Sequence, residues 1–191
     1  MAQPEGPAPV KVGVRLARPP DDLGEWLADG SAFEAAGADA LCIDPGPDSP
    51  LDPLILTAGL ATLTFRSLLI TTVPGPPAAR ARTLATIGRL SRGRLAILAG
   101  ADPVGIPPEL RVFRPVPGDP DVVEHMNGSD PVQRWVSVGC PDGRAAWRET
   151  LLDVTERGFQ GLLVPADPRL LDILRNPDDP GYRHDLQLAQ G

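Results

Sequence analysis

The stretch RARTLATIGRLSRGRLAILAG, residues 80–100, contains a helix that is followed almost at once by a strand. Apolar residues recur every three positions along its first half, at Leu84, Ile87 and Leu90. This spacing predicts one apolar stripe along a helix. Gly93 then acts as the helix stop, and the arginines on either side of it suit the negative end of the helix dipole. Residues 95–99 form a continuous apolar run, which is typical of a parallel strand buried on both faces.

The same alternation of strands and helices extends along the rest of the chain. Strands are predicted at residues 11–17, 38–44, 66–73, 94–100, 110–113, 134–140 and 161–165. Helices are predicted at residues 22–36, 52–64, 77–92, 142–157 and 169–175, with Asp22 and Asp52 as N-caps. Residues 11–175 are therefore expected to form one domain, loop-rich over residues 101–133 because of its many prolines. Residues 1–10 and 176–191 are predicted as tails.

Strands that alternate with helices imply a parallel sheet with helices outside it. A closed (β/α)8 barrel normally needs about 250 residues, and this chain has 191. The predicted fold class is therefore α/β: a truncated or incomplete TIM-type (β/α) barrel of parallel strands with helices outside. An open sheet of the same units is the alternative.

Composition excludes several classes of partner. The net charge of −7 argues against nucleic acid and anionic membranes. No apolar run approaches the roughly 18 residues of a membrane span, and the first residues lack the features of a secretory signal, so a cytoplasmic location is expected. Cys42 and Cys140 lie in or beside apolar runs. They are predicted to be buried free thiols, with a disulfide as the alternative.

Three segments resemble the bacterial luciferase-like family of flavin- and deazaflavin-dependent oxidoreductases. TLATIGRLSRGRLAILAG is similar to a helix of that family with the pattern TL-x-x-L-x-R-LS-x-GR, together with the strand after it. DPLILTAGLATLTFRSLLITTV and FEAAGADALCID resemble two segments that precede it in the family. The resemblance covers residues 11–102 in the family's order, and it is weak beyond residue 103.

The resemblance implies a flavoprotein, of oxidoreductase or monooxygenase type if active, that binds FMN or a deazaflavin at the carboxyl ends of the strands. It also implies a homodimer, or a heterodimer with a homologue, formed through the helices at 52–64 and 77–92. The chain departs from the family where Pro45 replaces a common histidine, where Ala99 replaces an expected glycine, and where much of the middle barrel is absent. These departures leave open a degenerate, non-catalytic member that acts as a dimerising or partner subunit.

The strand ends supply the candidate cofactor-binding residues, since the carboxyl ends of barrel strands line one functional rim. These are Asp44, Thr72, Val73, Gly100, Ala101, Gly139, Cys140, Gly143 and Arg144. Asp44 is either a hydrogen-bonding group for cofactor or substrate, or a turn former. Thr72-Val73 matches the place where the family carries a strained cis peptide against the flavin ring, although a β-branched pair is also ordinary at a strand end.

Residues 139–144 open a helix, whose free N–H groups and dipole suit a phosphate. Arg144 would add a bidentate contact. The alternative is a plain helix cap formed by Asp142. Three further arginines face either an anionic cofactor or solvent: Arg18, Arg80 and Arg82.

Histidine and metal chemistry have little support in the sequence. His125 and His184 stand in proline-rich or polar segments and are predicted to be solvated loop residues. No metal-ligand spacing, P-loop or dinucleotide fingerprint occurs. The sequence therefore assigns no catalytic residue and no metal.

Overall fold

A computed structural model of the protein describes residues 9–16, 22–46, 49–100, 105–125, 132–177 and 179. Its strands are β1 (Lys11–Leu16), β2 (Ala40–Ile43), β3 (Leu68–Thr71), β4 (Leu95–Leu98), β5 (Arg111–Val116), β6 (Asp119–His125), β7 (Gln133–Ser137) and β8 (Gly161–Pro165). Its helices are α1 (Leu23–Ala35), α2 (Pro53–Leu63), α3 (Ala81–Leu90), α4 (Arg144–Glu156) and α5 (Pro168–Arg175), with a 3-10 turn at Pro77–Arg80. The alternation predicted up to residue 100 is confirmed. The predicted tails lie mostly outside the described residues, as do Arg18, Ala101 and His184.

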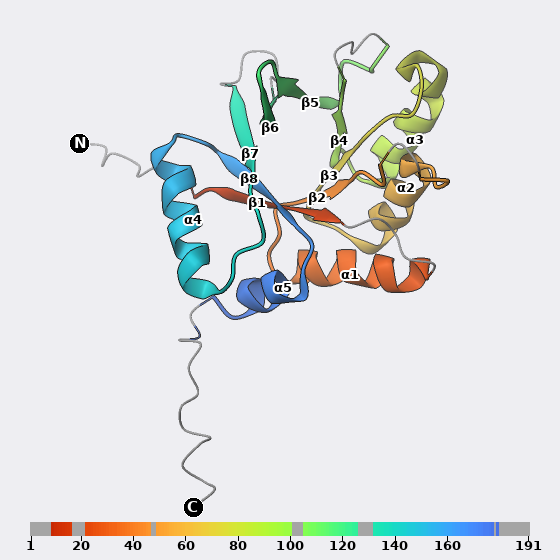
Figure 1. Ribbon diagram of the computed structural model, residues 1–191. Coiled ribbons are helices and arrows are strands. Elements are labelled where there is room, and N and C mark those ends of the chain that lie inside the picture. Colours follow the sequence, from red (N-terminus) through yellow and green to blue (C-terminus); the bar gives the residue numbers. More distant parts are fainter. Residues whose placement is uncertain are drawn as a thin grey trace, which may run out of the picture.

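The eight strands form a closed barrel in chain order, because β8 pairs with β1 as well as with β7. Neighbouring strands are parallel except around β6, which runs antiparallel to both β5 and β7 (Figure 1). The predicted truncated TIM-type barrel of parallel strands is therefore wrong, since the barrel is closed and mixed. A parallel neighbour needs a crossover of a dozen or more residues, whereas an antiparallel neighbour needs only a tight turn. Because the antiparallel pairs around β6 save these long crossovers, eight strands can close into a barrel in a short chain.

A tight hairpin joins β5 and β6, where the sequence predicted mostly loop. Its turn is formed by Pro117 and Gly118, and Gly118 has φ +83°, a conformation that favours glycine. Pro115 lies at a register shift in β5, one of the few positions where a sheet accepts proline. The prolines of this segment therefore lie within and between two strands and do not prevent them from forming. The expectation of a solvated His125 is also wrong, because its side chain is 7% exposed at the end of β6.

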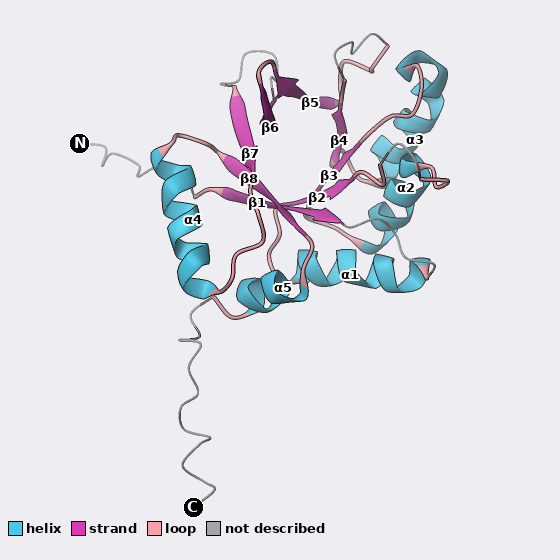
Figure 2. Cartoon of the chain, viewed as in Figure 1, coloured by secondary structure: helices cyan, strands magenta, loops and turns pink. Residues whose placement is uncertain are grey.

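The described helices lie outside the barrel (Figure 2). Two predicted helix starts are confirmed by their caps. The carboxylate of Asp22 accepts a hydrogen bond from the Gly24 N–H at 2.8 Å, and that of Asp52 accepts one from the Leu54 N–H at 2.8 Å. The apolar helix α2 packs against the barrel with Leu54 and Leu60, both fully buried.

Large side chains fill the barrel interior, and two glycines make room for the largest. Phe113 and Trp135 lie there edge to face, with ring centroids 5.6 Å apart. A Cβ added at Gly13 would lie 2.9 Å from Cζ3 of Trp135, and one added at Gly161 would lie 2.9 Å from Cε3 and closer still to two other ring atoms. The indole therefore occupies the space that a side chain at Gly161 would need, and it shares the space at Gly13 with Leu163, whose Cδ2 would lie 2.6 Å from the added Cβ.

The cysteines carry no disulfide. Cys42 is buried and free as predicted, whereas Cys140 is free but only half-buried. Among the helices that the structure describes, none has the length and apolar character needed to cross a membrane.

Candidate functional site

The carboxyl ends of the parallel strands lie at one end of the barrel, and their amino ends lie at the other. We call the end at Ile43, Thr71, Leu98, Ser137 and Pro165 the carboxyl mouth, and the end at Lys11, Leu68, Leu95, Arg111 and Gln133 the amino mouth. Since seven strands run the same way and β6 is reversed, the carboxyl mouth gathers the loops that follow β2, β3, β4, β7 and β8. Function in parallel barrels is expected at this end.

A cavity of about 500 Å³ lies at the carboxyl ends of β2 and β3. Three of the predicted site residues, Asp44, Thr72 and Val73, line it together. They meet because β2 and β3 are parallel neighbours in register, with Ile43 opposite Thr71. The remaining lining comes from the loop between Pro45 and Pro53, from Pro74 and from Arg80.

The polar groups of this β2–β3 cavity are partly occupied by local structure. The Asp44 carboxylate accepts a hydrogen bond from the Gly46 N–H at 3.2 Å, so the side chain also serves as a turn former. Arg80 Nη1 lies 3.7 Å from Oδ2 of Asp52, and both side chains are partly exposed. The described lining therefore holds two carboxylates and one guanidinium, a slight excess of negative charge.

The Thr72–Val73 peptide is trans, as are all peptide bonds within the described ranges. The cis bond that the resemblance implied is therefore absent. Thr72 and Val73 are each half-buried, and the preceding Thr71 is buried with its hydroxyl 3.4 Å from the Pro53 carbonyl oxygen, to which it donates. That contact ties the end of β3 to the first turn of α2.

Gly100 lies beside the β2–β3 cavity and does not line it. It borders a cavity of about 230 Å³ at the ends of β3 and β4, together with Ala99 and Ile106. Val73 lines both cavities, so the two are neighbours at the same mouth. Ala101 falls outside the described residues.

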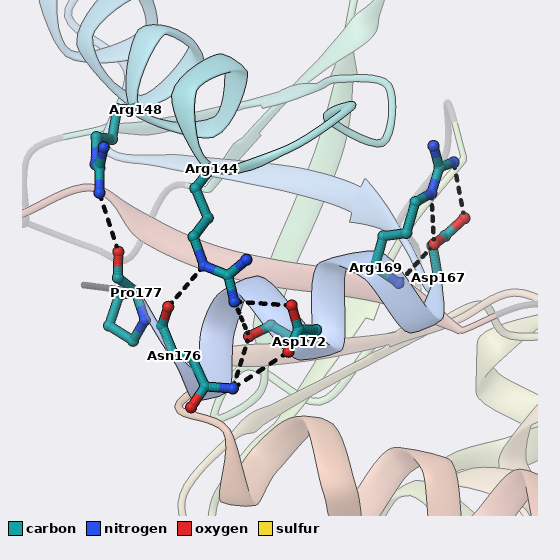
Figure 3. A network of polar contacts seen from close by, with 7 residues as sticks. All are labelled: Arg144, Arg148, Asp167, Arg169, Asp172, Asn176 and Pro177. Atoms are coloured by element: carbon teal, nitrogen blue, oxygen red, sulfur yellow. Dashed lines mark hydrogen bonds and ion pairs between the residues drawn. The ribbon is translucent and has the colours of Figure 1, made fainter. Parts of the chain in front are cut away.

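Gly143 and Arg144 lie at the start of α4, on a separate cavity of about 370 Å³. Arg144 Nη2 lies 2.7 Å from Oδ2 of Asp172, and its Nε–H donates to the Asn176 carbonyl oxygen at 2.8 Å (Figure 3). The guanidinium thus joins α4 to α5. Gly143 is the N-cap, so the alternative of a cap formed by Asp142 is wrong.

The Asp142 carboxylate instead lies 3.5 Å from Nη1 of Arg169. Gly139 is exposed and Cys140 half-buried in the loop that leads there. Burial raises the pKa of the Cys140 thiol, and the nearby carboxylate of Asp167 adds to the rise. The predicted residues that the structure describes therefore do not form one pocket: three line the β2–β3 cavity, and Gly143 and Arg144 line another.

The sequence interpretation missed two polar residues in the carboxyl mouth, Arg15 and Ser137. Arg15 Nη2 donates to Ser137 Oγ at 2.8 Å, across the intervening strand β8. Burial raises the pKa of Cys42 to about 11, against an opposing effect of Arg15, so this thiol is protonated near neutral pH. The alternation of Lys11, Gly13 and Arg15 along one face of β1 was the available signal for an inward arginine.

A scan against protein-family models and a search of curated proteins both return no match for this chain. Across the described ranges, no group of three or more histidine, cysteine or acidic side chains is placed to hold a metal ion.

Proposed function

We propose that the protein is a small luciferase-like barrel that binds the ring of FMN or a deazaflavin in the β2–β3 cavity. One observation carries the proposal. Asp44, Thr72 and Val73 belong to the segments that resemble the family, and they line one cavity of about 500 Å³ at the carboxyl mouth. Ligand pockets typically measure about 300–1,000 Å³, so the cavity is large enough for a flavin ring.

The lining suits the ring better than the phosphate. The lining includes Thr72, Val73 and several prolines, which are uncharged, and the Asp44 carboxylate can accept a hydrogen bond from a ring N–H. A phosphate would have to compete with Asp52 for Arg80. We therefore expect riboflavin and FMN to bind with similar affinity.

When bound, the ring would supply hydride or electron transfer. The chain would bind it, orient it and exclude water. The described lining holds two carboxylates and one guanidinium as its ionisable groups. We therefore propose that any oxidoreductase or monooxygenase activity comes from the chemistry of the bound ring.

The test is an absorbance spectrum of the purified protein, followed by titration with FMN, riboflavin and a 5-deazaflavin. We expect a saturable shift of the visible band. Thr72→Trp, which fills the cavity, should abolish the shift, whereas Thr86→Trp on the exposed side of α3 should leave it unchanged. Absence of binding at tens of micromolar ligand would reject the proposal.

A second candidate, a dimerising or partner subunit, is favoured by the exposed apolar side chains around α2 and α3. These are Ile55, Leu63, Phe65 and Leu90, which are 46–67% exposed. Exposed apolar side chains that gather on one surface often mark a protein–protein interface. We propose that this surface pairs with a second copy or with a homologue.

Sedimentation velocity tests this candidate. We expect a dimer that Ile55→Glu dissociates, while Leu152→Glu on α4 does not, although Leu152 is similarly exposed at 62%. A wild-type monomer, both alone and mixed with a full-length relative, would exclude the pairing.

A further inference from the structure

A second cavity of about 440 Å³ opens at the amino mouth, at the opposite end of the barrel from the proposed flavin site. Its lining comes from the beginnings of six strands and from the end of the reversed strand β6. The lining residues with ionisable side chains are Lys11, Asp39, Arg66, Arg92, Arg94, Arg111 and His125. The reversed β6 is what brings His125 to this end.

The cavity is strongly basic in a chain whose net charge is −7. Five lysine or arginine side chains line it, against one aspartate. None of the five lies within 4.0 Å of a carboxylate among the residues that the structure describes. Even Asp39 is partly engaged, because its carboxylate accepts a hydrogen bond from the Val12 N–H at 2.8 Å.

Three of the five cations are held by the protein itself. Arg94 donates to the carbonyl oxygens of Ser67 and Thr64, both at 2.7 Å. Arg92 lies over the ring of Phe65, with Cζ 5.5 Å from the centroid. Arg66 donates to the Glu34 carbonyl oxygen at 3.2 Å.

The other two cations, Lys11 and Arg111, make no side-chain hydrogen bond or ion pair within the described ranges. Both are exposed, and they begin β1 and β5. These strands are four places apart in an eight-stranded barrel, so the two side chains approach the cavity from opposite sides. They are therefore free to hold an anion between them.

The inner wall of the cavity is aromatic. Phe113 and Trp135 line it and are each 2% exposed. The indole Nε1–H of Trp135 and the Nε–H of Arg94 are both buried without a hydrogen-bond partner among the described residues. A buried donor without a partner is unusual in a native protein, and both of these donors belong to residues that line this one cavity.

We propose that the amino mouth binds a small organic anion with a flat aromatic body. Its phosphate or carboxylate group is held between Lys11 and Arg111 at the rim. Its ring lies against Phe113 and Trp135, and an acceptor on it takes the indole N–H. The cations without an ion pair in the described ranges and the two donors without a partner there belong to residues that line the same cavity.

The test uses 1-naphthyl phosphate as the probe and the tryptophan indole N–H signals of the ¹⁵N-labelled protein as the readout. The chain has three tryptophans, and Trp135→Phe assigns the signal of the one in the cavity. We expect a saturable shift of the Trp135 signal, while those of Trp26 and Trp147 stay in place. Neutral 1-naphthol and inorganic phosphate should each bind more weakly by about tenfold or more.

Variants at the rim distinguish binding in this cavity from non-specific attraction of the anion to any arginine or lysine. Lys11→Gln and Arg111→Gln should each weaken binding of the probe by about tenfold. Arg114→Gln, an exposed arginine on the same strand as Arg111, should leave it unchanged. Unmoved Trp26 and Trp147 signals verify that each variant is folded.

Three results would overturn the proposal: no shift of the Trp135 signal at millimolar probe, equal binding by the rim variants and the wild type, or equal binding of inorganic phosphate and the probe. Thr72→Trp should leave binding of the probe intact. Failure at the amino mouth is therefore distinguishable from failure of the flavin site.

Discussion

Replacing Gly161 by alanine tests how the barrel interior is packed. The added Cβ would lie 2.9 Å from Cε3 of Trp135 and nearer still to Cδ2 and Cε2. Trp135 is 2% exposed and also lies edge to face against Phe113, which limits how far its ring can move. Overpacking of this kind costs typically about 1–3 kcal/mol.

A glycine-to-alanine change normally alters the free energy of unfolding in the opposite direction. Where the backbone allows it, alanine raises the free energy of unfolding by about 0.4–1 kcal/mol, by restricting the unfolded chain. Gly139 provides that comparison, because it is exposed, has no positive φ, and has nothing within 4 Å of an added Cβ. We expect Gly161→Ala to lose about 1–3 kcal/mol and Gly139→Ala to be neutral or slightly stabilising.

Urea unfolding followed by far-UV circular dichroism measures both variants. In thermal unfolding the loss for Gly161→Ala should appear as a fall in Tm of about 2–4 °C per kcal/mol. Trp135→Leu, which removes the obstructing ring, should make Gly161→Ala nearly neutral in that background. If Gly161→Ala were as stable as the Gly139 variant, the indole would not fill the barrel as described.

Three further predictions follow from individual contacts. Burial alone would raise the pKa of Glu34, but hydrogen bonds to its carboxylate from the N–H groups of Ser67, Arg66 and Phe65 outweigh it and hold the pKa below 4.5. The stabilisation is therefore present above pH 4.5 and lost as the pH falls through the lowered value. Glu34→Gln should cost about 1–3 kcal/mol at neutral pH and flatten the acid limb of stability, whereas Glu156→Gln should do neither. Cys42, with a pKa of about 11, should resist a disulfide reagent in the native protein near pH 8, and mass spectrometry should find the half-buried Cys140 labelled first; earlier labelling of Cys42 would contradict its burial. Arg144→Gln should lower the free energy of unfolding by about 1 kcal/mol, because its side chain joins Asp172 and Asn176. Arg148→Gln, whose contact with the Pro177 carbonyl oxygen is 3.4 Å long, should change it by less than about 0.5 kcal/mol; equal effects would show that the α4–α5 contact is not a stabilising one.

The sequence was sufficient to predict the positions of those helices and strands whose hydrophobic periodicity is strong. The apolar stripe of α3, the run of β4 and the caps at Asp22 and Asp52 all lie within a few residues of where the pattern placed them. Local signals of this kind act over one or two turns and need no knowledge of the partner element. They also predicted that the ends of β2 and β3 would supply residues to the same mouth.

The closure of the barrel could not be predicted in the same way. β6 reads DPDVVEH, with a proline and three acidic residues, and only Val122 and Val123 provide an apolar signal. Its place in the barrel depends on pairing with β5 and β7, which periodicity does not reveal. The amino-mouth cavity depends on the same closure, because its basic residues come from strand starts far apart in the chain.

The most direct measurement is one ¹H–¹⁵N spectrum of the protein titrated first with riboflavin and then with 1-naphthyl phosphate. If the two mouths are separate sites, riboflavin should shift the amide signals of Thr72 and Val73 and leave the Trp135 indole signal in place. 1-Naphthyl phosphate should then shift the Trp135 indole signal and leave the amide signals of Thr72 and Val73 unchanged. Contradiction would come from both ligands shifting the same signals, or from neither of them shifting any.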